Sequence, residues 1–410
     1  MLSRPVSFAA LTAITVLFMA ASSAPSPLYV VYQQNWGFSA ATLTVVFAVY
    51  VLGLLGAVLV VGALSDHVGR RPVLAAAIAL EAAALVLFLL ADGVTVLLIA
   101  RLAQGIATGA AITTLGATLV DLDPPHAPGR AGTTNGVATV GGLAVGAIGC
   151  GALVQFAPAP THLVFALLLA GMVAAALVVA GMPETSARRP GGLASLRPRV
   201  GVPPRLRPEF FAVVPTLIAS WALGGLYLSL GPSVAAVLFG LHDHLVGGLV
   251  VTLLCGTGAV TAFTLRRVPV ARVLTAASVL LATGTLVTLG GIQVGSVALA
   301  ATGTVVAGVG FGAAALGTFG TLARIAAPAE RGELFAVAYT IAYLAFSVPA
   351  VIAGVASGLV GLRPTAEVYG IVVVALGIAA LTAQGLLGAR RARVPAAQPV
   401  PAACPDRSPA

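Results

Sequence analysis

Two charged side chains lie inside long apolar stretches of this sequence, where an ionised group is costly. Arg101 is about seven residues into the apolar run 94–120, and Glu81 is eight residues beyond Val73 in the run 73–91. An arginine at the centre of a bilayer costs at least about 2.5–3.5 kcal/mol on insertion scales. Arg101 is interpreted either as a functional group facing the interior of a helix bundle or as a side chain that reaches the membrane surface. Glu81 is interpreted as a proton carrier, because low dielectric favours a neutral carboxyl group, or as a counter-ion for Arg101.

A second charged cluster lies between two apolar runs, in the segment G-A-L-S-D-H-V-G-R-R that begins at Gly62. Gly62 and Gly69 permit close approach and a tight turn. Asp66 can accept charge-assisted hydrogen bonds from arginines such as Arg70 and Arg71, or from helix amides. If these charges served only to orient the chain in a membrane, neither Asp66 nor the two glycines would be needed. The segment is therefore interpreted as a turn with a structural or functional task of its own.

The elements that position these residues are membrane helices, because the composition leaves too little polar surface for a soluble globule. Of 410 residues, 59% are hydrophobic and 8% are charged, and the mean hydropathy is +1.06. A helix needs about 20 apolar residues to cross a bilayer. Twelve such runs are predicted, at 7–31, 41–64, 73–91, 94–120, 133–156, 162–182, 210–238, 245–265, 271–290, 296–325, 334–360 and 367–388. Pro25 and Pro27 predict a kinked outer half of the first of these helices.

An internal repeat divides the runs into two sets of six. Gly105-Ile-Ala-Thr-Gly109-Ala-Ala in the fourth run is followed 203 residues later by Gly308-Val-Gly-Phe-Gly312-Ala-Ala in the tenth. Glycines at this spacing could reflect close helix packing alone, but the loops that follow also match, which favours duplication. The predicted fold class is thus an all-α integral membrane protein, with twelve transmembrane helices in two pseudo-symmetric six-helix bundles.

The domain boundaries and the orientation follow from the arginines. We expect an N-terminal bundle at 1–183, a cytoplasmic basic linker at 184–209, a C-terminal bundle at 210–388 and a disordered cytoplasmic tail at 389–410. All 21 basic residues are arginines, and placing both termini in the cytoplasm puts all but two of them on the side where positive charge accumulates. The net charge of +9 is therefore explained by topology, and no nucleic-acid partner is expected.

The glycine-rich turn resembles the loop after the second helix in transporters of the major facilitator superfamily. The stretch from Arg101 to Gly109, with Gln104 and Thr108, is similar to the fourth-helix motif of the same superfamily, which is associated with proton coupling. The resemblance implies that Arg101 is a coupling residue, and Glu81 is added to it because of its position inside a span. Many proton-driven drug exporters of this superfamily instead carry an acidic residue in helix 1, where this sequence has none. The resemblance also implies a cytoplasmic latch between the two halves, which we define as Gly62, Asp66, Gly69, Arg70, Arg71 and Arg130. The segment from Gly142 to Gly151 is similar to the glycine-rich fifth-helix motif of antiporters, with Ala147 in place of the proline. Glycines that serve only close helix packing would give the same pattern.

The same resemblance implies that helices 1, 4, 7 and 10 line a central cavity, flanked by 2, 5, 8 and 11. The polar and aromatic residues in the middle of those helices are the predicted substrate cavity: Ser22, Ser23, Gln104, Thr108, Trp221, Tyr227, Thr318, Tyr339 and Tyr343. Trp221 is either an aromatic platform for a ligand or a packed bundle residue. A mostly apolar cavity favours amphipathic compounds over sugars or phosphates.

The predicted function is secondary active transport of a small molecule by alternating access, as proton-coupled efflux of amphipathic compounds. The alternatives are proton-coupled import of a metabolite and, in another class, a receptor or scaffold that transports nothing. No enzyme is expected, since the spans offer no His-Glu pair or Ser-Lys couple. The sequence has no phosphate-binding loop, which excludes an ATP-driven pump unless a partner supplies the motor. We expect no metal and no cofactor, with the proton as coupling ion. The expected partners are the substrate and the lipid bilayer, for a monomer in the inner (plasma) membrane.

Overall fold

The structure is a computed structural model that describes residues 2–62, 64–124, 129–187, 189–196, 201–327 and 330–393. Within these residues, 12 helices are long and apolar enough to cross a membrane, which confirms the predicted all-α membrane fold. The first half contains α1 (Arg4–Ser23), α2 (Pro25–Trp36), α3 (Ala40–Val61), α4 (Ser65–Val68), α5 (Arg70–Leu89), α6 (Val94–Asp121), α7 (Arg130–Phe156) and α8 (Leu163–Gly181). Of these, α1 and α2 together form one candidate span, and α4 is a single turn.

The second half has the same order of spans. It contains α10 (Arg207–Ser229), α11 (Gly231–Phe239), α12 (His244–Thr264), α13 (Val270–Val294), α14 (Val297–Ile325), α15 (Arg331–Val360) and α16 (Leu362–Arg393). Between the halves lie α9 (Gly192–Ser195) and the 3-10 turn η1 (Pro204–Leu206), and a second 3-10 turn, η2 (Leu265–Arg267), follows α12. The last helix extends five residues beyond each end of the predicted run 367–388. Residues 188, 197–200 and 394–410 of the predicted linker and tail lie outside the described residues.

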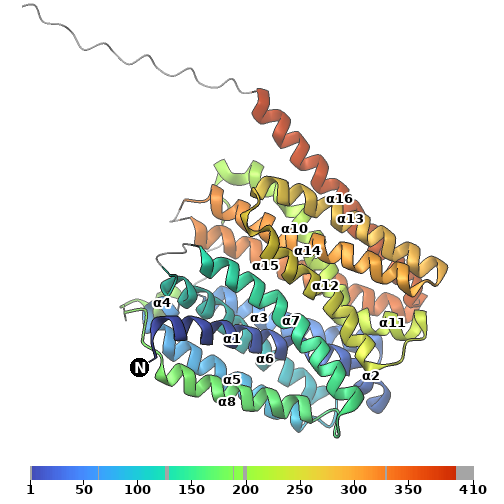
Figure 1. The fold of residues 1–410 in the computed structure, drawn as a ribbon, viewed down its shortest axis with the longest axis horizontal. Helices are drawn as coiled ribbons and strands as arrows, with labels where there is room; N and C mark the ends of the chain where they lie inside the picture. Colours follow the sequence, from blue (N-terminus) through green and yellow to red (C-terminus); the bar gives the residue numbers. More distant parts are fainter. Residues whose placement is uncertain are drawn as a thin grey trace, which may run out of the picture.

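The repeat seen in the sequence is a repeat of packing. In the first half α6 packs on α3, where a Cβ at Gly109 would lie only 2.4 Å from the carbonyl oxygen of Leu54. In the second half α14 packs on α12, where a Cβ at Gly312 would lie 2.1 Å from the carbonyl oxygen of Gly258. Equivalent glycines thus bring the fourth helix of each half against the second. Figure 1 shows the two bundles side by side, the first in blue to green and the second in yellow to red.

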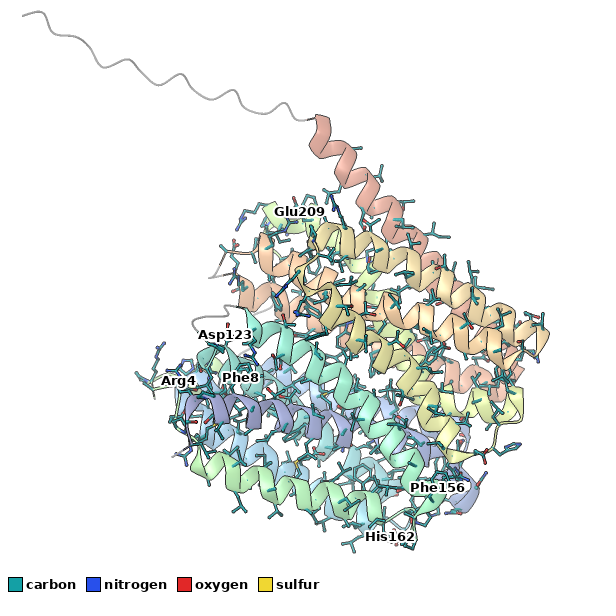
Figure 2. The ribbon with its side chains drawn as sticks, viewed as in Figure 1. Arg4, Phe8, Asp123, Phe156, His162 and Glu209 are labelled. Atoms are coloured by element: carbon teal, nitrogen blue, oxygen red, sulfur yellow. The ribbon has the colours of Figure 1, made fainter. Side chains whose placement is uncertain are left out.

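The halves meet along α7 and α12, and the contact is tightest at one end. A Cβ at Gly248 of α12 would lie 2.4 Å from the carbonyl oxygen of Ala147 on α7. Nearer the helix ends, the backbone N–H of His244 donates to Gln155 Oε1 at 3.0 Å. We call this the closed end. Figure 2 shows Phe156 and His162 at this end, far from Arg4, Phe8 and Asp123.

A second contact between the halves joins α3 and α15, also toward the closed end. The rings of Phe47 and Phe346 lie 5.1 Å apart, and a Cβ at Gly354 would lie 2.0 Å from Thr44 Oγ1. At the opposite end, which we call the open end, α7 and α12 line a cavity of about 990 Å³ together with α1. The two halves are therefore in close contact at one end and separated by a cavity at the other.

Candidate functional site

The centre of the candidate site is Arg101, whose side chain is 1% exposed. Its Nε donates to Tyr29 Oη at 2.9 Å, and its Nη2 donates to the same oxygen. Its Nη1 donates to Gln104 Oε1 at 2.7 Å and to the carbonyl oxygen of Ser22 at 3.1 Å. The guanidinium is thus held inside the first bundle by α1, α2 and α6, and it does not reach the end of the helix.

Three aromatic rings surround the same guanidinium. Its carbon atom Cζ lies 5.3 Å from the ring centre of Tyr29, 5.1 Å from that of Tyr50 and 5.9 Å from that of Phe88. Cation–π attraction is strongest where water is excluded, at about 2 kcal/mol or more per desolvated contact. These rings and the hydrogen bonds together offset the cost of burying the charge.

A break in the first span lies beside two of the hydrogen-bond acceptors in the site. Pro25 has no N–H, so the carbonyl oxygen of Ala21, four residues earlier, loses its helical donor. The Nε2 of Gln104 donates to that carbonyl at 3.1 Å, and Arg101 bonds the next one, at Ser22. The helix is interrupted where Pro25 and Pro27 predicted a kink, with α1 ending at Ser23 and α2 beginning at Pro25.

Glu81 is fully buried and lies on the far side of Gln104 from the arginine. The amide Nε2 of Gln104 donates to Glu81 Oε1 at 2.9 Å, while Oε2 of the same carboxyl group has no hydrogen-bond partner. Among the described residues, no ion pair joins Glu81 directly to Arg101. The two predicted coupling residues are therefore neighbours linked through one amide side chain. Chemically, the free oxygen is able to take up a proton.

Two tyrosines that sequence reasoning did not select complete this network. Tyr29 accepts from Arg101, and the hydroxyl of Tyr50 donates to Ser22 Oγ at 2.8 Å. Ser22 Oγ also lies 3.5 Å from Thr108 Oγ1. The Pro25 turn, four residues before Tyr29, was the available signal for that tyrosine, whereas nothing in the sequence marked Tyr50.

Three predicted cavity residues of the second half form an aromatic cluster. The ring of Trp221 lies 4.8 Å from that of Tyr343 and 5.8 Å from that of Phe346. Tyr339 lies 6.2 Å from Tyr343, and Phe346 touches Phe47 of the first half. This aromatic cluster therefore adjoins the boundary between the halves, with Trp221 only partly buried.

The remaining predicted cavity residues are engaged elsewhere. Ser23 Oγ donates to the carbonyl oxygen of Leu143 on α7 at 2.8 Å. The hydroxyl of Tyr227 lies 2.8 Å from Thr304 Oγ1, and Thr318 Oγ1 donates to a carbonyl of its own helix. The structure does not bring these three side chains to the arginine network or to the aromatic cluster.

The predicted latch residues of α4 and α5 are bound within the first half. Arg70 pairs with Asp66 at 2.6 Å and with Asp121, at the end of α6, at 3.1 Å. Gly69 has φ 103°, a backbone conformation that favours glycine, and a Cβ there would lie 2.8 Å from Glu184 Oε2. Gly62, in contrast, has helical dihedral angles.

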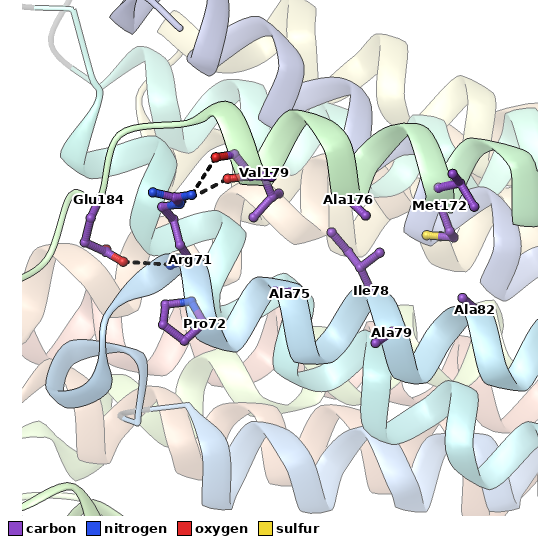
Figure 3. Close-up of a pocket in the computed structure, with 12 residues that line it drawn as sticks. Arg71, Pro72, Ala75, Ile78, Ala79, Ala82, Met172, Ala176, Val179 and Glu184 are labelled. Carbon is purple, nitrogen blue, oxygen red and sulfur yellow. Dashed lines mark hydrogen bonds between the residues drawn. The ribbon is translucent and has the colours of Figure 1, made fainter. Parts of the chain in front are cut away.

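Arg71 and Glu184 join the start of α5 to the end of α8, as Figure 3 shows. Arg71 donates from its side chain to the carbonyl oxygens of Val179 at 3.1 Å and Ala180 at 2.5 Å. Partial burial alone would raise the pKa of Glu184, but backbone N–H donors from four residues outweigh that effect and lower its pKa below the ordinary value of 4.5. No role in this cluster was predicted for Glu184.

Arg130 does not contact Asp66 in this conformation. Its guanidinium lies 5.7 Å from the ring centre of Phe8 on α1. Asp123 accepts from the backbone N–H groups of Gly129 and Ala131 at 2.8 and 2.9 Å, which caps the start of α7. Arg130 therefore lies beside the cavity of the open end rather than in the cluster around Arg70.

The glycines of the fifth-helix motif make close helix contacts. A Cβ at Gly142 would lie 2.6 Å from Met19 Cβ on α1, and one at Gly151 would lie 2.9 Å from the carbonyl oxygen of His244 on α12. One face of α7 thus packs on its own half and another on the opposite half. Tight packing explains these glycines without reference to the antiporter motif.

Comparison with known proteins agrees with this fold. The sequence profile of the Major Facilitator Superfamily matches residues 11–348. A bacterial homolog of the human lysosomal transporter Spinster, solved in an inward-facing and unoccupied conformation, aligns with a TM-score of 0.75 and 14% identity over 93% of this chain and 97% of that chain. The human organic anion transporter MFSD10 (TETRAN) aligns with a TM-score of 0.64 and 17% identity over 94% of this chain and 100% of that one. None of the curated protein sequences matches.

The fold and the two-bundle site define a membrane transporter rather than an enzyme. The chain belongs to the major facilitator superfamily. The predicted resemblance is thereby confirmed at the level of the superfamily.

Proposed function

We propose that this transporter is a secondary active carrier that exports small amphipathic compounds in exchange for protons. The observation that carries the proposal is the buried chain Glu81–Gln104–Arg101, with one carboxylate oxygen unpartnered. An isolated buried carboxylate is costly, whereas a neutral carboxyl group is tolerated. Glu81 thus has two charge states with different interactions in the same place, which is what a proton carrier requires.

The network offers a physical route from the proton to the transport cycle. A negative Glu81 attracts Arg101 through Gln104, and protonation removes that attraction. Arg101 in turn binds the carbonyl of Ser22 and the hydroxyl of Tyr29, on either side of the break between α1 and α2. The helix α2 packs against α11 and α12 of the second half. A change in the hydrogen bonds between Arg101 and α2 therefore affects the interface between the bundles.

The aromatic cluster supports the class of substrate. Trp221, Tyr339, Tyr343 and Phe346 offer ring faces at the boundary of the halves, where flat apolar or cationic compounds bind well. On the predicted topology the open end is cytoplasmic, so the conformation described is the one that takes up an exported compound. In the outward-open conformation, the latch residues around Arg70 would bridge to the second half.

Transport in proteoliposomes under an imposed pH gradient tests the proposal. With ethidium as the first probe, wild-type protein is expected to accumulate dye against its gradient and to move protons in the opposite direction, followed by a pH-sensitive dye in the lumen. Arg101→Ala and Glu81→Gln should abolish coupled transport while the protein still folds and inserts. Glu367→Gln on α16 removes a carboxylate outside the network and serves as the matched control.

Three outcomes would contradict parts of the proposal. Full activity in Arg101→Ala would remove that residue from coupling. Dye and protons moving in the same direction would favour the importing symporter. Unchanged dye distribution at every gradient, across a panel of amphipathic probes, would argue against transport of this substrate class.

A further inference from the structure

A groove on the flank of the molecule separates the two halves at the open end. It has a volume of about 990 Å³ and is lined by α1, α7, α12 and the turn η2. Its rim carries Arg130, Arg266 and Arg267, while Val16, Val137, Val145 and Phe263 contribute much of its apolar wall. We call this region the flank groove. No residue of α6, α10 or α14 lines it, so it lies beside the central axis.

The three arginines at its rim have no ion-pair partner among the residues that the structure describes. Arg266 lies over the ring of Phe263, with 3.9 Å between Cζ and the ring centre, and Arg130 lies over Phe8. The nearby carboxylate of Asp123 is occupied by two backbone N–H groups. The rim is therefore a cluster of three positive charges, two of which lie over aromatic rings.

The wall of the groove suits an acyl chain. Val145 is 56% exposed and Phe263 is 51% exposed, and both lie on membrane-spanning helices. From Arg130 to Val145 the helix α7 rises by about 22 Å, at 1.5 Å per residue. Half of the hydrocarbon core of a bilayer measures about 15 Å, so the wall is longer than one leaflet is thick.

We propose that the flank groove binds an anionic glycerophospholipid from the surrounding bilayer. Its phosphate group lies among Arg130, Arg266 and Arg267, and one acyl chain follows the wall toward Val145. Basic pockets between transmembrane helices favour anionic headgroups, with a contribution of about 1 kcal/mol per arginine near the surface. A zwitterionic lipid carries a compensating positive charge, so it gains less from the same rim.

The position of the groove gives the bound lipid a conformational effect. The helices α7 and α12 approach most closely at the closed end, where a Cβ at Gly248 would overlap the carbonyl oxygen of Ala147, and less closely beside the groove, where a Cβ at Gly141 would lie 3.7 Å from Ala259 Cβ. Alternating access to the other conformation brings their open ends together and removes the space for the lipid. A ligand that binds one conformation shifts the population toward it. The anionic lipid therefore stabilises the open groove and slows its closure.

Lipid binding by the purified full chain tests the assignment. Native mass spectrometry would compare dioleoyl phosphatidylglycerol with dioleoyl phosphatidylcholine, which has the same chains. Wild-type protein is expected to prefer the anionic lipid, and that preference should weaken as salt rises. Each Arg→Gln substitution at the rim should weaken binding roughly fivefold, which corresponds to about 1 kcal/mol.

Matched variants separate the groove from the general positive charge of this end. Arg266→Gln with Arg267→Gln should lose the preference, while Arg266→Lys with Arg267→Lys should keep most of it. Arg272→Gln with Arg324→Gln removes the same charge from exposed positions outside the groove and should bind as wild type does. Equal binding by the rim and control variants would overturn the assignment.

Two further measurements identify the source of the anion and its effect. Glycerol 1-phosphate, a headgroup without chains, should fail to displace the phospholipid; displacement at equal concentration would point to a soluble-anion site and refute the lipid proposal. Spin labels at Gly132 and Val268, on α7 and beyond α12, report the width of the groove. Anionic lipid should increase the population with the longer distance in wild type and not in the double Gln variant. An equal response in both would refute the conformational effect.

Discussion

One glycine at the closed end gives a direct test of how the two halves are held together. Gly248 of α12 faces α7, and a Cβ placed there would lie 2.4 Å from the carbonyl oxygen of Ala147. Ordinary contacts of a Cβ begin at 3.4 Å, so alanine at this position must move the two helices apart by roughly 1 Å. Overpacking of this kind costs about 1–3 kcal/mol.

This cost applies only to the conformation described, because the overlap disappears when the closed end opens. The population of that conformation should therefore fall about 5–150-fold relative to the opposite one. Gly256 provides the control, two turns along the same helix. A Cβ there would lie 3.6 Å from Ala144 Cβ, so Gly256→Ala fits against the same neighbour. Its only expected effect is a small gain in helix stability, about 1 kcal/mol.

Double electron–electron resonance between spin labels at Phe156 and His242 would measure the opening. Both positions are exposed, and the three native cysteines would first be replaced by alanine. Gly248→Ala should add a longer distance between the labels, while Gly256→Ala should give the wild-type distribution. The same distance distribution in both variants would refute this prediction, because it would show that the close approach of α7 to α12 does not affect the balance between the two conformations.

Three further predictions concern the buried network and the cluster at the start of α5. Tyr29→Phe leaves two N–H groups of Arg101 without their acceptor. The detergent-solubilised variant should therefore unfold at a lower temperature, with a loss of folding stability of about 1–3 kcal/mol per unsatisfied group. An unchanged melting temperature would show that another acceptor replaces the hydroxyl. Asp121→Asn should lower the melting temperature of the protein more than Asp66→Asn does in the same assay. The reason is that the Asp121 side chain is 29% exposed, whereas that of Asp66 is 52% exposed. A larger effect of Asp66→Asn would contradict this ranking. Glu184 has a lowered pKa, so its contribution to stability is complete above its ordinary pKa of 4.5 and is lost as pH falls through the lower folded value. The difference in melting temperature between wild type and Glu184→Gln should therefore shrink below pH 4.5. A difference that stays constant with pH would show that the charged form of Glu184 is not the stabilising one.

The candidate site was predicted in part, and the reasons differ from residue to residue. The cost of burying Arg101 and Glu81 marked both from the sequence, because a charge within an apolar run needs an explanation wherever the chain folds. Pro25 similarly marked a backbone break. The partners that stabilise the arginine could not be found in this way, since a tyrosine such as Tyr50 is unremarkable in a membrane helix. Its ring reaches Arg101 only because Gly105 lets α6 approach α3 closely.

Twelve membrane helices can be predicted from hydropathy along the chain, because the hydrophobic effect acts on each apolar run locally and needs no partner. The repeat can be predicted too, since the duplicated glycines are visible in one dimension. The folded structure was needed to show that Gln104 lies between Glu81 and Arg101, that Arg70 pairs with Asp121 within its own half, and that a groove opens beside Arg130. These features depend on which faces of separate helices meet. That choice is made by side-chain packing between segments far apart in the chain, and hydropathy carries no information about it.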